Sequence, residues 1–154
     1  MRAIAVLAAA LALSACSHSR IAGTNIEDSP TTRAILEVFG KYRQALEARD
    51  ATGLLALAAP GYTDPGDASH GVGPTDYGSL QQKLQKDFAS VTGLKLEATV
   101  KDLAVEGDKA RLDYFQVLRY AVATQGGERW KSESDDARMK FVKVSGEWKI
   151  ASGL

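Results

Sequence analysis

The chain has 154 residues, and its 19 basic and 19 acidic side chains give a formal net charge of zero at pH 7. The basic residues are spread singly along the sequence, which argues against a nucleic-acid-binding protein. Past the first residues, no apolar run is long enough to cross a bilayer as a helix. The length is typical of one domain with a substantial hydrophobic core.

The N-terminus has the pattern of a secretory signal. Arg2 gives a positive start, residues 3–13 are all Ala, Ile, Val or Leu, and small residues then precede Cys16, the only cysteine. The apolar run is too short for a membrane span. We therefore predict that residues 1–15 are a signal peptide that is removed, and that the nucleophilic thiol of Cys16 accepts a lipid.

The string Leu13-Ser14-Ala15-Cys16 resembles the lipobox of bacterial lipoproteins. The resemblance implies a diacylated Cys16, and several acyl chains hold a protein stably on a membrane. Ser17 resembles the residue of lipoproteins sorted to the outer membrane, where the domain would face the periplasm. The alternative is an ordinary signal peptide with a cysteine near its cleavage site by chance. The polar residues 16–29 are predicted to be a flexible tether.

Three helices are predicted at the start of the domain, residues 30–154. Ser29-Pro30 is typical of a helix start, and the spacing of the apolar residues extends this helix to about residue 48. Asp50 is a plausible cap for a short second helix that ends before Pro60. A loop rich in Gly and Pro leads to a third helix, which opens at Asp76 or Thr75 and ends at Gly93.

Alternating apolar and polar residues predict an antiparallel meander after Gly93. Strands are expected near residues 94–101, 110–123, 129–144 and 148–150. The polar string at 135–138 predicts a bulge in the third strand, or a place where it lines something other than core. Helices first and strands afterwards give an α+β domain.

Two groups of strings stand out: residues 41–50, KYRQALEARD, with 54–57 after them, and residues 139–143 with 146–150. Together with the order of the elements, they resemble the nuclear-transport-factor-two-like superfamily, which includes ketosteroid isomerase and SnoaL-type cyclases. The resemblance implies a cone-shaped curved antiparallel sheet wrapped around three N-terminal helices, with a pocket at the open end and an outer sheet face that often forms a homodimer. The candidate pocket residues are Tyr42, Tyr62, Asp64, Tyr114, Leu118, Tyr120 and Asp136.

The chemistry of ketosteroid isomerase needs a carboxylate base, a tyrosine and a protonated aspartate. By resemblance, Tyr42 matches the tyrosine and Asp64, which precedes a proline, matches the base. The third position falls on Ala137 or Arg138, with Asp136 one step away and on the opposite face unless a bulge intervenes. The donor pair is therefore incomplete, and no catalytic residue is assigned.

Other chemistries have less support. Asp64, Asp67, His70 and Asp76 share one loop, but they lack the alternating spacing of a hard-cation site, so no metal is predicted. Gly71-Val72-Gly73 lacks the strand and helix of a nucleotide fingerprint, and no cofactor is predicted. The expected function is a lipid-anchored cell-envelope module that binds a small or hydrophobic ligand, or a protein partner, in the cone. The alternative is a proton-transfer enzyme with Asp64 as base and Tyr42 as donor.

Overall fold

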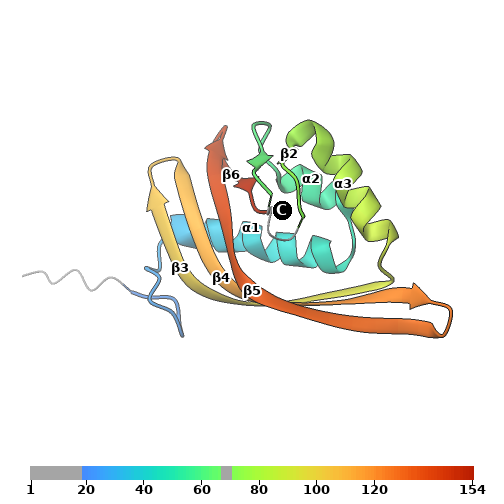
Figure 1. Ribbon diagram of the computed structural model, residues 1–154. Helices are drawn as coiled ribbons and strands as arrows, with labels where there is room; N and C mark the ends of the chain where they lie inside the picture. The colour runs from blue at the N-terminus through green and yellow to red at the C-terminus, as the bar shows by residue number, and fades with distance from the viewer. Residues whose placement is uncertain (1–18, 67–70) are drawn as a thin grey trace, which may run out of the picture.

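The computed structural model describes residues 19–66 and 71–154, and Figure 1 shows their arrangement. The predicted signal peptide and Cys16 lie outside these residues, as do Asp67 and His70. Three helices lie on one side of a curved four-stranded antiparallel sheet, so the fold is α+β, as predicted.

The helices begin where the capping residues predict. Helix α1 (Pro30–Glu47) starts after Ser29, whose hydroxyl accepts a hydrogen bond from the backbone N–H of Thr32. Helix α2 (Ala51–Leu57) is capped by Asp50, and α3 (Tyr77–Ala89) by Asp76. None of the helices in the described part of the chain is both long and apolar enough to cross a membrane.

The sheet is a meander in chain order. Its strands are β3 (Gly93–Glu106), β4 (Lys109–Thr124), β5 (Gly127–Val144) and β6 (Glu147–Ser152), each antiparallel to the next. Two further strands of two residues each, β1 (Thr63–Asp64) and β2 (Thr75–Asp76), pair with one another inside the segment predicted as loop. The far ends of β4 and β5 extend beyond the helices (Figure 1).

The register of the strands determines which residues share a face, which alternation alone left open. Leu112 lies opposite Met139 and Tyr114 opposite Ala137. Leu112, Tyr114 and Met139 are buried in one cluster with residues of α1, so this face is the inner, concave one. Phe115 has the opposite parity on β4 and lies on the outer face, where it is 38% exposed.

Of the two expectations for residues 135–138, the bulge is wrong, because β4 and β5 pair without a break from Lys109 opposite Val142 to Thr124 opposite Gly127. The other expectation, that the strand lines something other than core there, agrees with the exposure of residues 135, 136 and 138. The register shifts instead between Val100 and Asp102 of β3, and between Lys140 and Phe141 of β5 where it pairs with β6. The polar string is regular strand whose two faces are both reached by solvent.

The predicted tether differs from the structure from Ser19 onward. The Ile21 N–H donates to the Ile26 carbonyl at 2.9 Å, and the Asp28 N–H donates to the Ser19 carbonyl at 2.6 Å. Ile26 is only 4% exposed. One buried apolar side chain and a few backbone hydrogen bonds thus fold residues 19–28 into a short hairpin, although this segment has no hydrophobic period.

Candidate functional site

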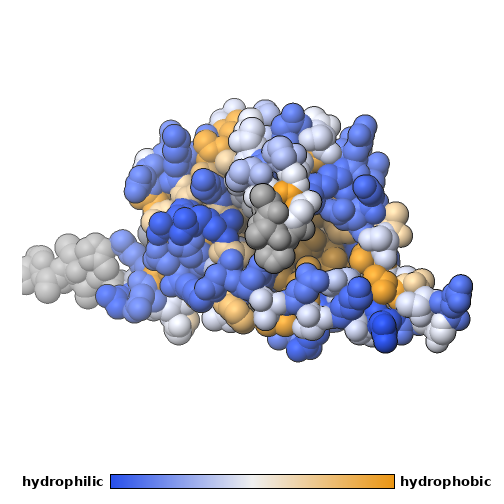
Figure 2. Space-filling model, viewed as in Figure 1, coloured by the Kyte–Doolittle hydropathy of each residue, from blue (hydrophilic) through white to orange (hydrophobic). Residues whose placement is uncertain are grey.

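The concave side of the molecule is hollowed. Figure 2 shows a hollow with hydrophobic walls between α3 and the far half of β5, here called the cone hollow. On this side, the inner face of β4 runs from buried Leu112 and Tyr114 to half-buried Leu118 and Tyr120. The inner face therefore becomes gradually more accessible along β4 toward its far end.

Two tyrosines are buried side by side beneath this inner face. Tyr42 of α1 is 6% exposed and Tyr114 of β4 is 2% exposed. The ring of Phe39 lies 5.8 Å from that of Tyr42 and 4.8 Å from that of Tyr114, centre to centre. Such offset and tilted contacts between aromatic rings stabilise a packed core. The predicted pocket residues Tyr42 and Tyr114 are thus brought together.

Burial keeps both phenols protonated. It raises the pKa of Tyr42 well above the usual value, and the nearby Tyr114 hydroxyl adds to the effect. Burial also raises the pKa of Tyr114 to about 12; a hydrogen bond with the Tyr42 hydroxyl opposes this rise, and the charge of Asp135 adds to it. The pair can therefore offer a hydroxyl donor at neutral pH.

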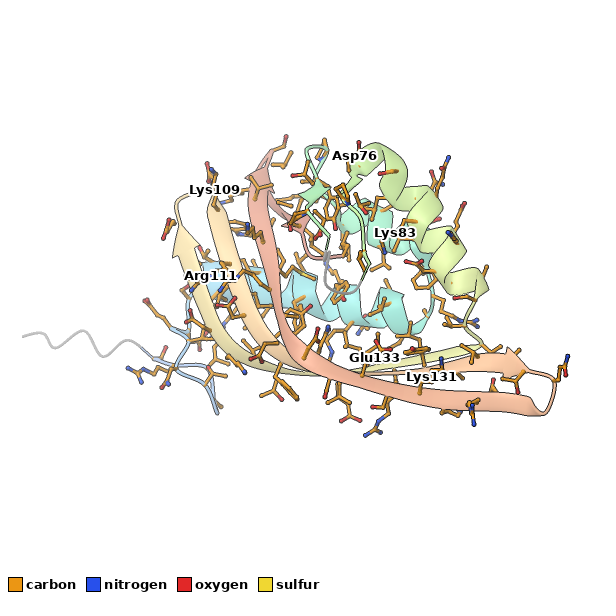
Figure 3. The ribbon with its side chains drawn as sticks, in the orientation of Figure 1. Asp76, Lys83, Lys109, Arg111, Lys131 and Glu133 are labelled. Carbon is orange, nitrogen blue, oxygen red and sulfur yellow. The ribbon has the colours of Figure 1, made fainter. Side chains whose placement is uncertain are left out.

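Polar pairs follow on the inner face toward the far end of the strands. Gln116 Nε2 donates to Asp135 Oδ1 at 2.9 Å, and the Tyr120 hydroxyl donates to Glu133 Oε1 at 2.6 Å. In Figure 3, Lys131 and Glu133 of β5 lie on one side of the cone hollow and Lys83 of α3 on the other. The hollow therefore has an apolar wall and a charged mouth.

Tyr62 is buried in the same core cluster as Tyr42 and Tyr114, but its hydroxyl and the Asp64 carboxylate form hydrogen bonds with the end of β6 and the residues that follow it. The Leu154 N–H donates to the Tyr62 hydroxyl at 3.0 Å. Asp64 Oδ2 accepts from the Gly153 N–H at 2.7 Å and from the Ser152 hydroxyl at 3.1 Å. Burial raises the pKa of Tyr62 to about 12, and the charge of Asp64 contributes to this rise.

The second oxygen of Asp64 is also engaged. Asp64 Oδ1 accepts from the Gly66 N–H at 2.8 Å, as in an Asx turn. Both carboxylate oxygens are therefore occupied by groups of the chain itself. Gly66 has φ 71° there, and a Cβ at this position would lie 2.3 Å from the Val72 carbonyl oxygen, so the turn requires glycine.

Asp136, a predicted pocket residue, does not share the inner face with Tyr114 and Tyr120. Asp136 lies opposite Phe115 on the outer face and forms an ion pair with Lys101. Because no bulge shifts the register, its neighbour Asp135 takes the inward position and lies opposite Gln116. Sequence reasoning missed Gln116, Glu133 and Asp135. The alternation of β4 points to Gln116, two residues after Tyr114, whereas the two acidic residues needed the β4–β5 register.

No metal centre is found in the described ranges, where no group of three or more His, Cys, Asp or Glu residues could hold an ion. Tyr42, Tyr114, Leu118 and Tyr120 remain as predicted residues on the inner side. The chemistry available there is hydrogen bonding by hydroxyl, amide and carboxylate groups next to an apolar wall.

The fold is similar to that of several solved proteins. A protein from Kribbella flavida, Kfla4162, superposes with a TM-score of 0.71 at 16% identity over 82% of this chain and 90% of that one. A ketosteroid isomerase-like protein from Erwinia carotovora atroseptica gives 0.69 at 15% identity over 81% and 94%. An NTF2-like superfamily protein from Salmonella enterica gives 0.67 at 12% identity over 80% and 89%.

These identities establish a shared fold and no more. No protein-family model matches the chain, and no protein of curated function matches its sequence. The fold predicted from residues 41–50 and 139–150 is confirmed by the solved structures, since they include proteins named as NTF2-like and ketosteroid isomerase-like.

Proposed function

We propose that this protein is a lipid-anchored module of the cell envelope that binds a small hydrophobic molecule with a polar end in the cone hollow. The observation that carries the proposal is the order of side chains on the inner face. Apolar residues and the buried Tyr42–Tyr114 pair come first, and the pairs Gln116–Asp135 and Tyr120–Glu133 follow nearer the solvent.

This order matches what small-molecule sites provide, namely a mostly apolar wall with a few placed polar groups. The Leu118 side chain and the Tyr120 ring would contact the apolar body of a ligand, and a hydroxyl or amide would receive its polar end. The charged groups at the mouth are exposed, so they contribute little to affinity and more to orientation.

The proton-transfer alternative has less support than binding. Its base would be Asp64, but that carboxylate accepts hydrogen bonds from Gly66, Ser152 and Gly153. To take a proton from a substrate it would first have to give up part of this arrangement. The likeness to a ketosteroid isomerase-like protein concerns the fold.

Mass spectrometry of small molecules extracted from the purified protein tests the binding proposal. We expect an apolar compound in extracts of the wild type and its loss in Leu118→Arg, because a long cation on the inner face of β4 would fill the hollow and desolvate a charge. Extracts free of small molecules, or an equal yield from the variant, would contradict the proposal.

The anchor is a separate part of the proposal and rests on the string that ends at Cys16. The hairpin that begins at Ser19 supports it only indirectly, by leaving few residues between that cysteine and the folded domain. A domain held so close to a bilayer would meet ligands that leave or enter the membrane. Outer-membrane attachment facing the periplasm follows from Ser17 by resemblance.

A further inference from the structure

The outer face of the sheet carries a second concave surface, distinct from the cone hollow. It has a volume of about 760 Å³ and lies where the end of β3, the start of β4 and the end of β5 meet β6. We call it the outer groove. Its apolar lining includes Ala59, Pro60, Ala104, Val142, Val144 and Ala151 as well as the core residues Ala110 and Phe141, and its charged side chains are Glu106, Lys109, Arg111 and Lys140.

Register places the outer groove on the opposite side of the sheet from the tyrosine pair. Lys109 lies opposite Val142, and Arg111 lies opposite Lys140. These residues alternate with Ala110 and Leu112, which belong to the buried core. Figure 3 shows Lys109 and Arg111 at the same end of β4, away from Lys83 and Lys131.

Three cations gather beside the apolar surface of the groove. Arg111 and Lys140 are directly opposite one another, and like charges in this position destabilise a sheet. Lys109 is their diagonal neighbour, within reach of a long side chain. Like charges held side by side next to an apolar surface suit an anionic ligand with an apolar part.

The two lysines form no ion pair in the described residues, although Glu106 lies opposite Lys109 on the neighbouring strand. Arg111 is paired with Asp102 at 2.9 Å and lies 3.3 Å from Asp113. Neither Lys109 nor Lys140 has an ion pair within residues 19–66 and 71–154. Glu106 supplies the one carboxylate among the described residues that line the groove. An anion at the groove would therefore meet two ammonium groups that nothing else in the described chain engages.

We propose that the outer groove binds an amphiphilic anion, a single alkyl chain that ends in a carboxylate. The alkyl chain lies on Ala104, Val142 and Val144, and the carboxylate lies between the ammonium groups of Lys109 and Lys140. The volume is within the usual range of small-molecule sites. This site is independent of the cone hollow and of the function proposed for it.

A second copy of the chain fits the groove less well. A twofold contact centred on it would bring the same patch of both copies together. The basic side of one copy would then lie near the basic side of the other, and only Glu106 could compensate within the groove. A carboxylate that approaches two unpaired lysines meets the complementary charge instead.

Photo-crosslinking with a dodecanoate that carries a diazirine at its alkyl end tests the proposal on the full-length protein in membrane vesicles. We expect crosslinked peptides from residues 140–144 and the neighbouring end of β3. Excess dodecanoate should suppress them, and dodecyltrimethylammonium, which has the same chain and the opposite charge, should not.

Variants give the second arm of the test. The double variant Lys109→Gln/Lys140→Gln should lower crosslinking about tenfold at a fixed probe concentration, since two exposed charge contacts are lost. Lys95→Gln removes a cation from the same outer face at the far end of β3 and should leave the yield unchanged. The proposal is overturned if the crosslinks are confined to peptides around Leu118, or if both amphiphiles suppress them equally. It is also overturned if the groove residues are crosslinked, or become buried, only between two copies of the chain.

Discussion

Asp64 has a structural role, because its carboxylate binds the last residue of β6 and the residue after it. Its sequence context, between a threonine and a proline, matches a catalytic base by resemblance, but in the structure its carboxylate joins the β1 turn to Ser152 and Gly153. Gly153 has φ 98°, which residues with a side chain rarely adopt. A glycine at this position therefore allows the backbone conformation in which its N–H points at Asp64.

The first prediction concerns this carboxylate. Asp64→Ala should lower the free energy of unfolding by about 1–3 kcal/mol, because the N–H groups of Gly66 and Gly153 lose their acceptor. Urea unfolding followed by circular dichroism measures the change. Asp87→Ala, which removes an exposed partner of Lys83, should cost less than about 1 kcal/mol. Equal losses in the two variants would mean that Asp64 is not a structural link.

The second prediction concerns Tyr114, whose pKa is raised by burial to about 12. An unfolded tyrosine has a pKa of about 10, so the stabilising effect of burial is fully present below pH 10. Between about pH 10 and 12 the unfolded chain releases its proton first, and the free energy of unfolding falls as the pH rises.

Urea midpoints at pH 9, 10 and 11 should therefore fall steadily in the wild type and less steeply in Tyr114→Phe. Some slope must remain in the variant, because burial also raises the pKa of Tyr62 to about 12. Tyr77→Phe, at a tyrosine that is 38% exposed, is the control and should keep the slope of the wild type. Parallel slopes for the wild type and Tyr114→Phe would show that the Tyr114 hydroxyl is not buried as described.

At the scale of the elements, α1 closes part of the free edge of the sheet. Strand β3 pairs only with β4, so its other edge has backbone groups without a strand partner. Glu47 Oε1 accepts from the Leu96 N–H at 2.9 Å, and Arg43 Nη2 donates to the Leu96 carbonyl at 3.1 Å. Two side chains of α1 thus satisfy the edge of β3 at a residue that is 1% exposed.

The third prediction follows from this contact. Glu47→Ala should lower the free energy of unfolding by about 1–3 kcal/mol, because the Leu96 N–H is left without an acceptor beside a buried side chain. Glu37→Ala, on the exposed side of the same helix and paired with Lys41, should cost about 0.5 kcal/mol or less. Chemical denaturation of both variants measures the two changes in the free energy of unfolding. Similar small losses of stability in both would show that α1 does not protect this edge.

The elements differ in how much of them the sequence predicts. All three helices are predicted because their caps at Ser29, Asp50 and Asp76 are local signals. The meander follows from alternation and from its turns. Strand register decides three further features: which face is the inner one, where the bulges lie, and that Asp135 points inward. Register is a property of the assembled sheet, so the sequence of one strand does not reveal it.

At the scale of the whole molecule, the two faces of the sheet have different characters. The inner face is shared between α1 and the cone hollow, and the outer face carries ion pairs and the outer groove. Sequence reasoning found most of the inner side chains because tyrosines and leucines at alternate positions of β4 mark one face. The outer groove was not predicted, since its residues come from four strands and the turn after α2.

The fourth prediction concerns the proposed anchor. Cys16→Ala should move the protein from the membrane fraction to the soluble fraction, because the acyl chains that would hold it have no other attachment point in the proposed scheme. Fractionation with immunoblotting measures the distribution. Ser14→Thr, a change beside the cysteine that keeps a small residue, should leave the protein on the membrane, and an unchanged distribution of Cys16→Ala would rule out the anchor.

The central claim is that the cone hollow, on the concave side of the sheet, holds a small hydrophobic ligand, separately from the amphiphile proposed for the outer groove. Leu118 and Val117 are adjacent on β4 and belong to the inner and outer faces respectively. A titration with the neutral fluorescent probe Nile red, which lacks the negative charge proposed to be recognised at the outer groove, compares the wild type with Leu118→Arg and Val117→Arg. We expect Leu118→Arg to weaken probe binding by about tenfold or more, the equivalent of about 1.4 kcal/mol, and Val117→Arg to leave it unchanged. Equal affinities in all three proteins, or a loss confined to Val117→Arg, would contradict the claim.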